Sequence, residues 1–276
     1  MISMDKYSKT EKNDLRGEYL LSLKKAKARI HVLRIAILIL LITLWEVLTA
    51  HDILNPFIFS NPSRILATLN DLSVSGELWQ HIGTSVLETV IGFLSGTILG
   101  IIIAIILWWI PTVSKVLDPY LVVLNALPKT ALGPIFIVCM GTGIGAIIVM
   151  TLAISLIVTI LNVLNGFIHT DVEKVKLMKM LGANRLQIFR KLIMPANLST
   201  IVNVLKINIG LSWVGVITGE FLVSKAGLGY LIVYGSQVFK MDLVMSSVVV
   251  LAICAIIMHI CIVWLERATR RRFGIA

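Results

Sequence analysis

A group of side chains able to form ion pairs lies between residues 170 and 195. The segment separates two long apolar regions in a chain that elsewhere runs for dozens of residues without a charge. The charge of the segment, taken by itself, is explained by a cationic loop held against anionic lipid. The cations of the segment are Lys174, Lys176, Lys179, Arg185, Arg190 and Lys191.

Residue groups that could carry out catalysis are missing from the sequence. No G-x-x-x-x-G-K-[ST] motif occurs, so we expect no phosphate-binding loop and no ATP hydrolysis by this chain. The apolar runs show neither paired carboxylates nor histidines at metal-ligand spacing, so we expect no catalytic residue and no metal site. Cys139, Cys254 and Cys261 lie in apolar runs and are typical of small buried hydrophobes. The chain is therefore not expected to be an enzyme.

The first half of the 170–195 segment has the pattern of a short helix. Thr170 with Glu173 three residues later matches a capping box, which predicts a helix start at Thr170. Gly182 suits the left-handed conformation that ends a helix. Apolar residues recur at helical spacing and predict one apolar face opposite a cationic one. They are Val172, Val175, Met178 and Leu181.

The second half of the segment repeats this pattern. Asn184 with Gln187 predicts a second capped start. Pro195 either ends that helix or lies in the first turn of the next element, where its missing N–H has little cost. The segment is therefore predicted to form a helix, a tight bend and a second helix. A loop held only by lipid does not explain such a pattern.

Composition places the chain in a membrane. Hydrophobic residues make up 57% of the 276 residues and charged ones 14%, and the mean hydropathy is +0.92, all outside the usual range of soluble proteins. The net charge of +10 could indicate nucleic acid, but the basic residues lie at the ends of apolar runs rather than in one patch, so we expect a lipid bilayer and no nucleic acid.

Six apolar runs predict six transmembrane helices and an all-α integral membrane protein. Pro128, Lys129, Gly133 and Pro134 interrupt the third run, and broken membrane helices are typical of the walls of a pathway. Gly92, Gly96 and Gly100 in the second run allow close helix packing, either within one subunit or between two. The runs cover residues 33–50, 87–110, 117–140, 144–168, 201–222 and 243–265.

The basic residues predict the topology. Twenty of the 25 Lys and Arg residues lie in the N-terminal region through Arg34, at Lys115, in the 170–195 segment and in the C-terminal tail, against three in the alternate loops. This positive-inside asymmetry places both termini and the 170–195 loop, between spans four and five, in the cytoplasm. We thus expect a cytoplasmic arm at 1–31, a six-span domain at 32–265 and a basic cytoplasmic tail at 266–276.

The 170–195 segment resembles the cytoplasmic loop of bacterial ABC-importer permeases. The spacing of Gly182, Ile193 and Met194-Pro195 matches the family's Glu-Ala-Ala, Gly and Leu-Pro pattern, with Lys176, Leu177 and Met178 in place of Glu-Ala-Ala. In that family the loop is a coupling helix that docks on a separate ATPase. The resemblance implies these coupling residues: Glu173, Lys176, Leu177, Met178, Leu181, Gly182, Ala183, Asn184, Arg185, Phe189 and Pro195.

Shorter motifs extend the resemblance over residues 56–265. Asn61-Pro62-Ser63, the run 78–85, Ser212-Trp213 with Gly219-Glu220, and the outer-loop glycines Gly227 and Gly229 resemble the nitrate, sulfonate and taurine branch. The resemblance implies a bacterial inner-membrane permease for a small anionic or organic nutrient. It also implies two ATPase subunits that hold ATP and Mg, a second permease copy in a homodimer, and an extracytoplasmic substrate-binding protein, with no cofactor bound by this chain.

Polar residues inside the spans are candidates for the translocation path or gate. Glu220 could shape an outer gate or pair with a loop amide or Lys225, since an unpaired carboxylate in hydrocarbon is costly. Lys129 could favour anionic cargo or extend its amine to water. Asn208 and Trp213 could line the path or pack between helices. A self-sufficient secondary transporter or channel is the alternative class, disfavoured by the scarcity of ionisable groups in the spans and the lack of a clear inverted repeat.

Overall fold

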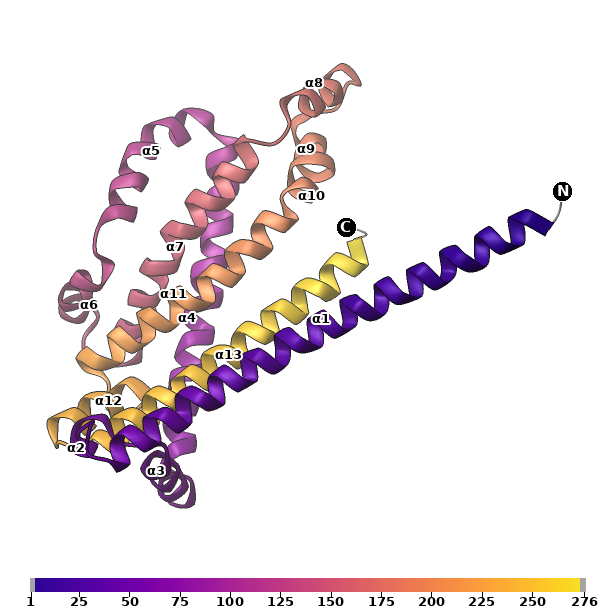
Figure 1. The fold of residues 1–276 in the computed structure, drawn as a ribbon. Coiled ribbons are helices and arrows are strands. Elements are labelled where there is room, and N and C mark those ends of the chain that lie inside the picture. The colour runs from indigo at the N-terminus through magenta and orange to yellow at the C-terminus, as the bar shows by residue number, and fades with distance from the viewer. Residues whose placement is uncertain (1–2, 274–276) are drawn as a thin grey trace. The chain divides into compact units, whose positions relative to one another are not determined.

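The computed structural model describes the backbone of residues 3–273 and the side chains of residues 25–26, 28–30 and 32–267. Every regular element within these residues is a helix, and the described part of the chain contains no strand (Figure 1). The chain divides into two compact units, Met1–Ile65 and Leu66–Ala276.

The helices follow one another with short connections. The first unit contains α1 (Ser3–Ala50), α2 (Pro56–Phe59) and the start of α3 (Pro62–Val74). The second contains α4 (Glu77–Trp109), α5 (Pro111–Ala126), the 3₁₀ turn η1 (Lys129–Leu132), α6 (Gly133–Met140), α7 (Ile144–Ile168), α8 (Val172–Met180), α9 (Arg185–Ile188), the π-helical η2 (Phe189–Ile193), α10 (Met194–Ala196), α11 (Leu198–Val223), α12 (Leu228–Gln237) and α13 (Met241–Phe273).

The prediction of six membrane spans is confirmed. Five described helices are long and apolar enough to cross a membrane, and α5 with η1 and α6 forms a sixth candidate that bends by 89°. The bend lies where Pro128 and Pro134 interrupt the third run, because proline removes a backbone donor and blocks helix continuation. The predicted limits of the second span were too short, since α4 begins ten residues earlier, at Glu77.

The first unit is held together by caps at the starts of its short helices. Asn55 accepts a hydrogen bond from the Phe57 amide at 2.9 Å and begins α2. Glu46 of α1 accepts hydrogen bonds from the amide and hydroxyl of Ser63 at 3.1 and 2.8 Å. A carboxylate at this place satisfies free amides at the start of α3. The predicted arm and first span form one continuous helix in α1.

The core of the second unit is the packing of α4, α7 and α11 against one another (Figure 1). The glycine stripe of α4 lies on α7: a Cβ at Gly100 would come within 2.5 Å of the Thr159 Cβ, and a Cβ at Gly92 within 2.7 Å of the Thr151 Cβ. The stripe therefore packs within one subunit, which decides between the two alternatives left by the sequence.

Lys206 of α11 forms an ion pair with α13. Its Nζ lies 2.5 Å from the Glu266 carboxylate. Glu266 is 8% exposed. A buried ion pair of this kind joins the start of α11 to the end of α13, and removal of one partner would leave an uncompensated charge.

Candidate functional site

The segment after α7 folds as the helix-turn-helix that its sequence predicts, with one correction at its start. The N-cap of α8 is Asp171 rather than Thr170. Its Oδ1 accepts hydrogen bonds from the amides of Glu173 at 3.0 Å and Lys174 at 3.4 Å. The predicted capping box was wrong because Asp171 is equally suited to capping and lies one residue closer to the helix.

The same hydrogen bonds act on the charge of Asp171. The bond from the Glu173 amide, assisted by that from Lys174, lowers the pKa of the Asp171 carboxyl from its usual value. The stability contributed by this cap is therefore present above the carboxyl's unfolded-state pKa. It is lost as the pH falls through the lowered pKa of the folded state.

The turn and the second helix match their predictions. Gly182 has a φ of +77°, the left-handed conformation that glycine adopts without strain. Asn184 Oδ1 accepts from the Gln187 amide and Gln187 Oε1 accepts from the Asn184 amide, both at 2.8 Å, which completes a capping box. Pro195 lies in the first turn of α10, the second of its two predicted alternatives.

The two ends of this helix-turn-helix are tied to each other. Thr170 donates its hydroxyl to the Gly166 carbonyl at 3.1 Å and accepts a hydrogen bond from Asn197 Nδ2 at 2.7 Å. Asn197 is 6% exposed and also donates to the Ile193 carbonyl at 2.9 Å. These buried bonds join the end of α7 to the start of α11, so the segment leaves and re-enters the bundle at one fixed point.

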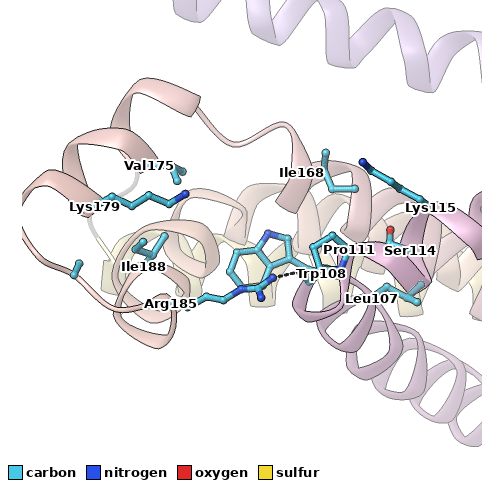
Figure 2. Close-up of a pocket in the computed structure, with 11 residues that line it drawn as sticks. Leu107, Trp108, Pro111, Ser114, Lys115, Ile168, Val175, Lys179, Arg185 and Ile188 are labelled. Atoms are coloured by element: carbon cyan, nitrogen blue, oxygen red, sulfur yellow. Dashed lines mark hydrogen bonds between the residues drawn. The ribbon is translucent and has the colours of Figure 1, made fainter.

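Arg185 fastens the turn to the end of α4. Its guanidinium donates to the Trp108 carbonyl at 3.0 Å (Figure 2) and lies 5.2 and 5.3 Å from the ring centroids of Trp108 and Trp109. Phe189 packs between these rings and Phe167, with centroids 5.1 to 6.3 Å apart. A cation at a helix C-terminus satisfies a free carbonyl and the helix dipole, and the rings add cation–π attraction.

The helix-turn-helix has an inner face on the bundle and an exposed outer face. Val175, Met178, Ala183 and Phe189 pack against the apolar core formed by α4, α7 and α11. Val172 and Leu181, predicted to share that apolar face, are instead 60% and 73% exposed. The outer face also carries Leu177, Met180 and Leu186. Six further predicted coupling residues are exposed: Glu173, Lys176, Gly182, Asn184, Arg185 and Pro195.

A second polar cluster lies at the opposite end of the bundle, where α12 meets α4 and α11 (Figure 1). The Glu220 carboxylate accepts from the Ser85 hydroxyl and from the Gly229 amide, both at 2.5 Å. Ser85 in turn accepts from the Leu228 amide at 2.7 Å. The loop-amide alternative for Glu220 is thus the one observed, since a carboxylate at the start of α12 satisfies its free amides.

The outer-loop glycines permit this contact. Gly227 has a φ of +118°, and a Cβ at this position would overlap the Glu220 carboxylate. A Cβ at Gly229 would come within 2.8 Å of the Glu220 Cβ. The Gly227 amide donates to His81 Nδ1 at 2.9 Å. Glycine is required at both positions because α12 begins directly on the carboxylate.

Three members of this cluster were missed at the sequence level. His81, Ser85 and Glu88 lie on one face of α4 at helical spacing and are 8%, 0% and 1% exposed. Glu88 lies within hydrogen-bonding reach of Glu220, and no other described group donates to its oxygens. The expectation of no paired carboxylates was therefore wrong. The spacing of His81, Ser85 and Glu88 within an apolar helix was the available signal.

The remaining predicted path residues do not come together. Asn208 is fully buried and donates to the hydroxyls of Thr97 at 2.9 Å and Thr159 at 2.6 Å. Trp213 is 4% exposed and packs with Phe93. Lys129 lies apart from both at the bend after α5, where its Nζ donates to the Asn125 carbonyl at 2.9 Å. Its amine thereby satisfies a free carbonyl in the last turn of α5.

This combination defines a class of protein: a polytopic α-helical membrane subunit that carries a capped helix-turn-helix at one end of its bundle. The model of the family described as "Binding-protein-dependent transport system inner membrane component" matches residues 96–275. The chain belongs to this family.

Curated relatives cover most of the chain. A putative aliphatic sulfonates transport permease protein of Bacillus subtilis is 27% identical over 77% of each chain. The taurine transport system permease protein of Escherichia coli is 26% identical over 85% of this chain and 87% of its own. A formylaminopyrimidine transport permease protein of Halalkalibacterium halodurans is 28% identical over 70% and 76%.

Solved structures share the fold. The methionine ABC transporter MetNI in an inward-facing conformation contains a chain with a TM-score of 0.60 and 18% identity, covering 71% of this chain and 95% of its own. An amino acid ABC transporter gives a TM-score of 0.56 at 14% identity, covering 74% and 97%. The chain thus shares its fold with chains of two ABC transporters.

Proposed function

We propose that the chain is the permease subunit of an ATP-driven importer and that the helix-turn-helix from α8 to α10 docks on a separate ATPase subunit. One observation carries the proposal. The segment is anchored to the bundle at Asn197 and Arg185, yet presents exposed leucine and methionine side chains among cations on its outer face. Contiguous exposed apolar residues outside the spans mark a protein interaction site.

The anchoring favours transmission of force. A segment held at both ends moves with α4, α7 and α11, so a displacement of the docked ATPase would tilt the bundle rather than bend a loop. Two ATPase copies holding ATP and Mg, a second permease copy in a homodimer, and an extracytoplasmic binding protein complete the proposed transporter. Both termini and the docking segment lie in the cytoplasm in this arrangement, as the distribution of basic residues favours.

The proposed cargo is a small organic or anionic nutrient such as a sulfonate, taurine or nitrate. The relatives named for sulfonates, taurine and a formylaminopyrimidine support this range. Lys129 is the predicted path residue with partial exposure, at the bend of the broken span, and we assign it to the path. Asn208, Trp213 and Glu220 are buried in helix packing, so their proposed part is to hold the helices that form the path.

Reconstitution tests this function. The permease is placed in vesicles with its cognate ATPase and binding protein, and uptake of taurine, an alkanesulfonate, nitrate and a formylaminopyrimidine is measured with and without ATP. We expect uptake of one of these classes to require all three components and ATP. Uptake by the purified permease alone would instead identify a secondary transporter or channel.

The docking surface is tested separately. Leu177→Glu with Leu181→Glu places two carboxylates on the outer face, where both wild-type side chains are more than half exposed. We expect the variant to insert and fold normally but to lose co-purification with the ATPase in mild detergent. Ile53→Glu with Val74→Glu, at 68% and 82% exposed sites outside both the segment and the candidate spans, is the matched control. Equal ATPase recovery from both variants would contradict docking at this face.

A further inference from the structure

A cavity of about 690 Å³ lies between the helix-turn-helix and the corner where α4 passes into α5. This volume is within the range of pockets that hold small ligands. Figure 2 shows side chains entering it from α4 and α5 on one side and from α8 and α9 on the other. The residues that line it are Leu107, Trp108, Pro111, Ser114, Lys115, Ile168, Val175, Lys179, Ala183, Arg185 and Ile188.

The charge of the cavity has one sign. Lys115 of α5 and Lys179 of α8 extend their amines toward one another across the gap (Figure 2), and Arg185 adds a third cation. The described lining contains no carboxylate. Neither lysine has an ion-pair partner among the described residues, whereas Lys174 nearby pairs with Asp171. Three cations without a counter-charge favour an anionic ligand.

Apart from Ser114, the rest of the lining is apolar, and part of it comes from the ends of two candidate spans. Leu107, Trp108 and Ile168 belong to the last turns of spans α4 and α7. Tryptophan at the end of a span is typical of the layer where headgroups meet hydrocarbon. The cavity thus combines cations with apolar side chains at the ends of two spans. A soluble anion would use the first feature alone, but an anionic amphiphile would use both.

We propose that this cavity binds the phosphate headgroup of an anionic phospholipid, with the amines of Lys115 and Lys179 on the phosphate and the glycerol and acyl carbons against Leu107 and Ile168. One such lipid would bridge α5 and α8, which belong to different parts of the chain. It would brace the docking segment from its inner face, opposite the surface that meets the ATPase. The site is independent of which nutrient the transporter carries.

Lipid titration tests the proposal. The purified full-length chain in detergent is titrated with phosphatidylglycerol or phosphatidylcholine, and bound lipid is counted by native mass spectrometry. We expect a retained phosphatidylglycerol that phosphatidylcholine does not replace. Lys115→Gln with Lys179→Gln should weaken this binding on the order of tenfold or more, given the contribution of each basic residue near anionic lipid. Lys174→Gln with Lys191→Gln, which removes equal charge from the same end of the bundle, should change it less than twofold, since neither residue lines the cavity.

Two further arms make the result decisive. Lys179→Glu alone changes one exposed residue of α8 and should lower phosphatidylglycerol binding even if the double variant does not fold. Glycerol 1-phosphate, which has the headgroup chemistry without acyl chains, should not displace the lipid at equal concentration. The proposal is overturned if glycerol 1-phosphate binds as tightly as the lipid, if phosphatidylcholine binds equally well, or if both lysine pairs have the same effect.

Discussion

At the scale of single residues, the most constrained contact is that between Glu220 and the start of α12. A serine hydroxyl and a backbone amide donate to the carboxylate at 2.5 Å and take the place of the water that would otherwise solvate it. Such a buried carboxylate is tolerated in a span only with donors of this kind. Gly227 and Gly229 have no side chain because the carboxylate occupies the space that a Cβ would need.

Replacement of Gly227 tests this contact. Gly227→Ala combines a left-handed backbone with a Cβ that overlaps the Glu220 carboxylate, so we expect destabilisation of about 1–3 kcal/mol. Thermal unfolding in detergent should show a lower midpoint, and less protein should accumulate in the membrane. Gly210→Ala is the matched control, because no atom lies within 4 Å of a Cβ at that position. Equal midpoints for the two variants would mean that the clamp on Glu220 has no energetic role.

At the scale of elements, the bend between α8 and α9 determines the shape of the docking segment. Gly182 is exposed, and a Cβ there would meet no atom within 4 Å. The requirement for glycine therefore comes from backbone conformation alone, not from space. A residue at φ +77° costs about 1–2 kcal/mol when it carries a Cβ, and asparagine tolerates this region better than branched residues.

Two substitutions at Gly182 separate backbone conformation from side-chain bulk. Gly182→Val should disturb the bend and reduce ATPase activity stimulated by the binding protein in reconstituted vesicles on the order of tenfold. Gly182→Asn, also larger than glycine, should retain most of that activity because asparagine adopts the left-handed region. Both variants should insert into the membrane at normal levels, since a Cβ at Gly182 would meet no atom within 4 Å. If valine and asparagine behave alike, the bend is not what transmits coupling.

At the scale of the whole second unit, α4, α7 and α11 approach closely through small and hydroxylated residues. Thr151, Ser155 and Thr159 donate their hydroxyls to carbonyls of their own helix at 2.8 to 3.1 Å, which leaves their carbons to pack on the glycines of α4. Helices in lipid associate by such close packing because hydrophobic burial gives little preference for protein over acyl chains.

Replacing a glycine of α4 by alanine should destabilise or stabilise the protein depending on which glycine is replaced. Gly100→Ala places a Cβ 2.5 Å from the Thr159 Cβ and 3.2 Å from the Leu156 carbonyl, so we expect destabilisation of about 1–3 kcal/mol from overpacking. Gly83→Ala meets no atom within 4 Å and should stabilise α4 by about 0.5–1 kcal/mol through helix propensity. Thermal unfolding in detergent followed by tryptophan fluorescence measures both. A stabilising Gly100→Ala would show that the helices do not pack as closely as described.

Much of the fold and part of the candidate site follow from local patterns. Hydropathy predicts the six spans because each one has to satisfy its own backbone within a single helix. The bend at Gly182 and the capping box of Asn184 with Gln187 are predictable since their partners lie within a few residues of each other. The start of α8 was misplaced by one residue, because Thr170 and Asp171 are both good caps and local sequence does not rank them.

Contacts between distant residues depend on how the helices pack, and no spacing in the chain encodes them. Thr170 does not cap α8; its hydroxyl instead accepts a hydrogen bond from Asn197, 27 residues later. Glu220 meets Ser85 across 135 residues. Lys115 of α5 and Lys179 of α8 line one cavity although they are far apart in the sequence. A helical pattern specifies which face of a helix is polar. Which other helix that face meets is settled by the fit of side chains in three dimensions.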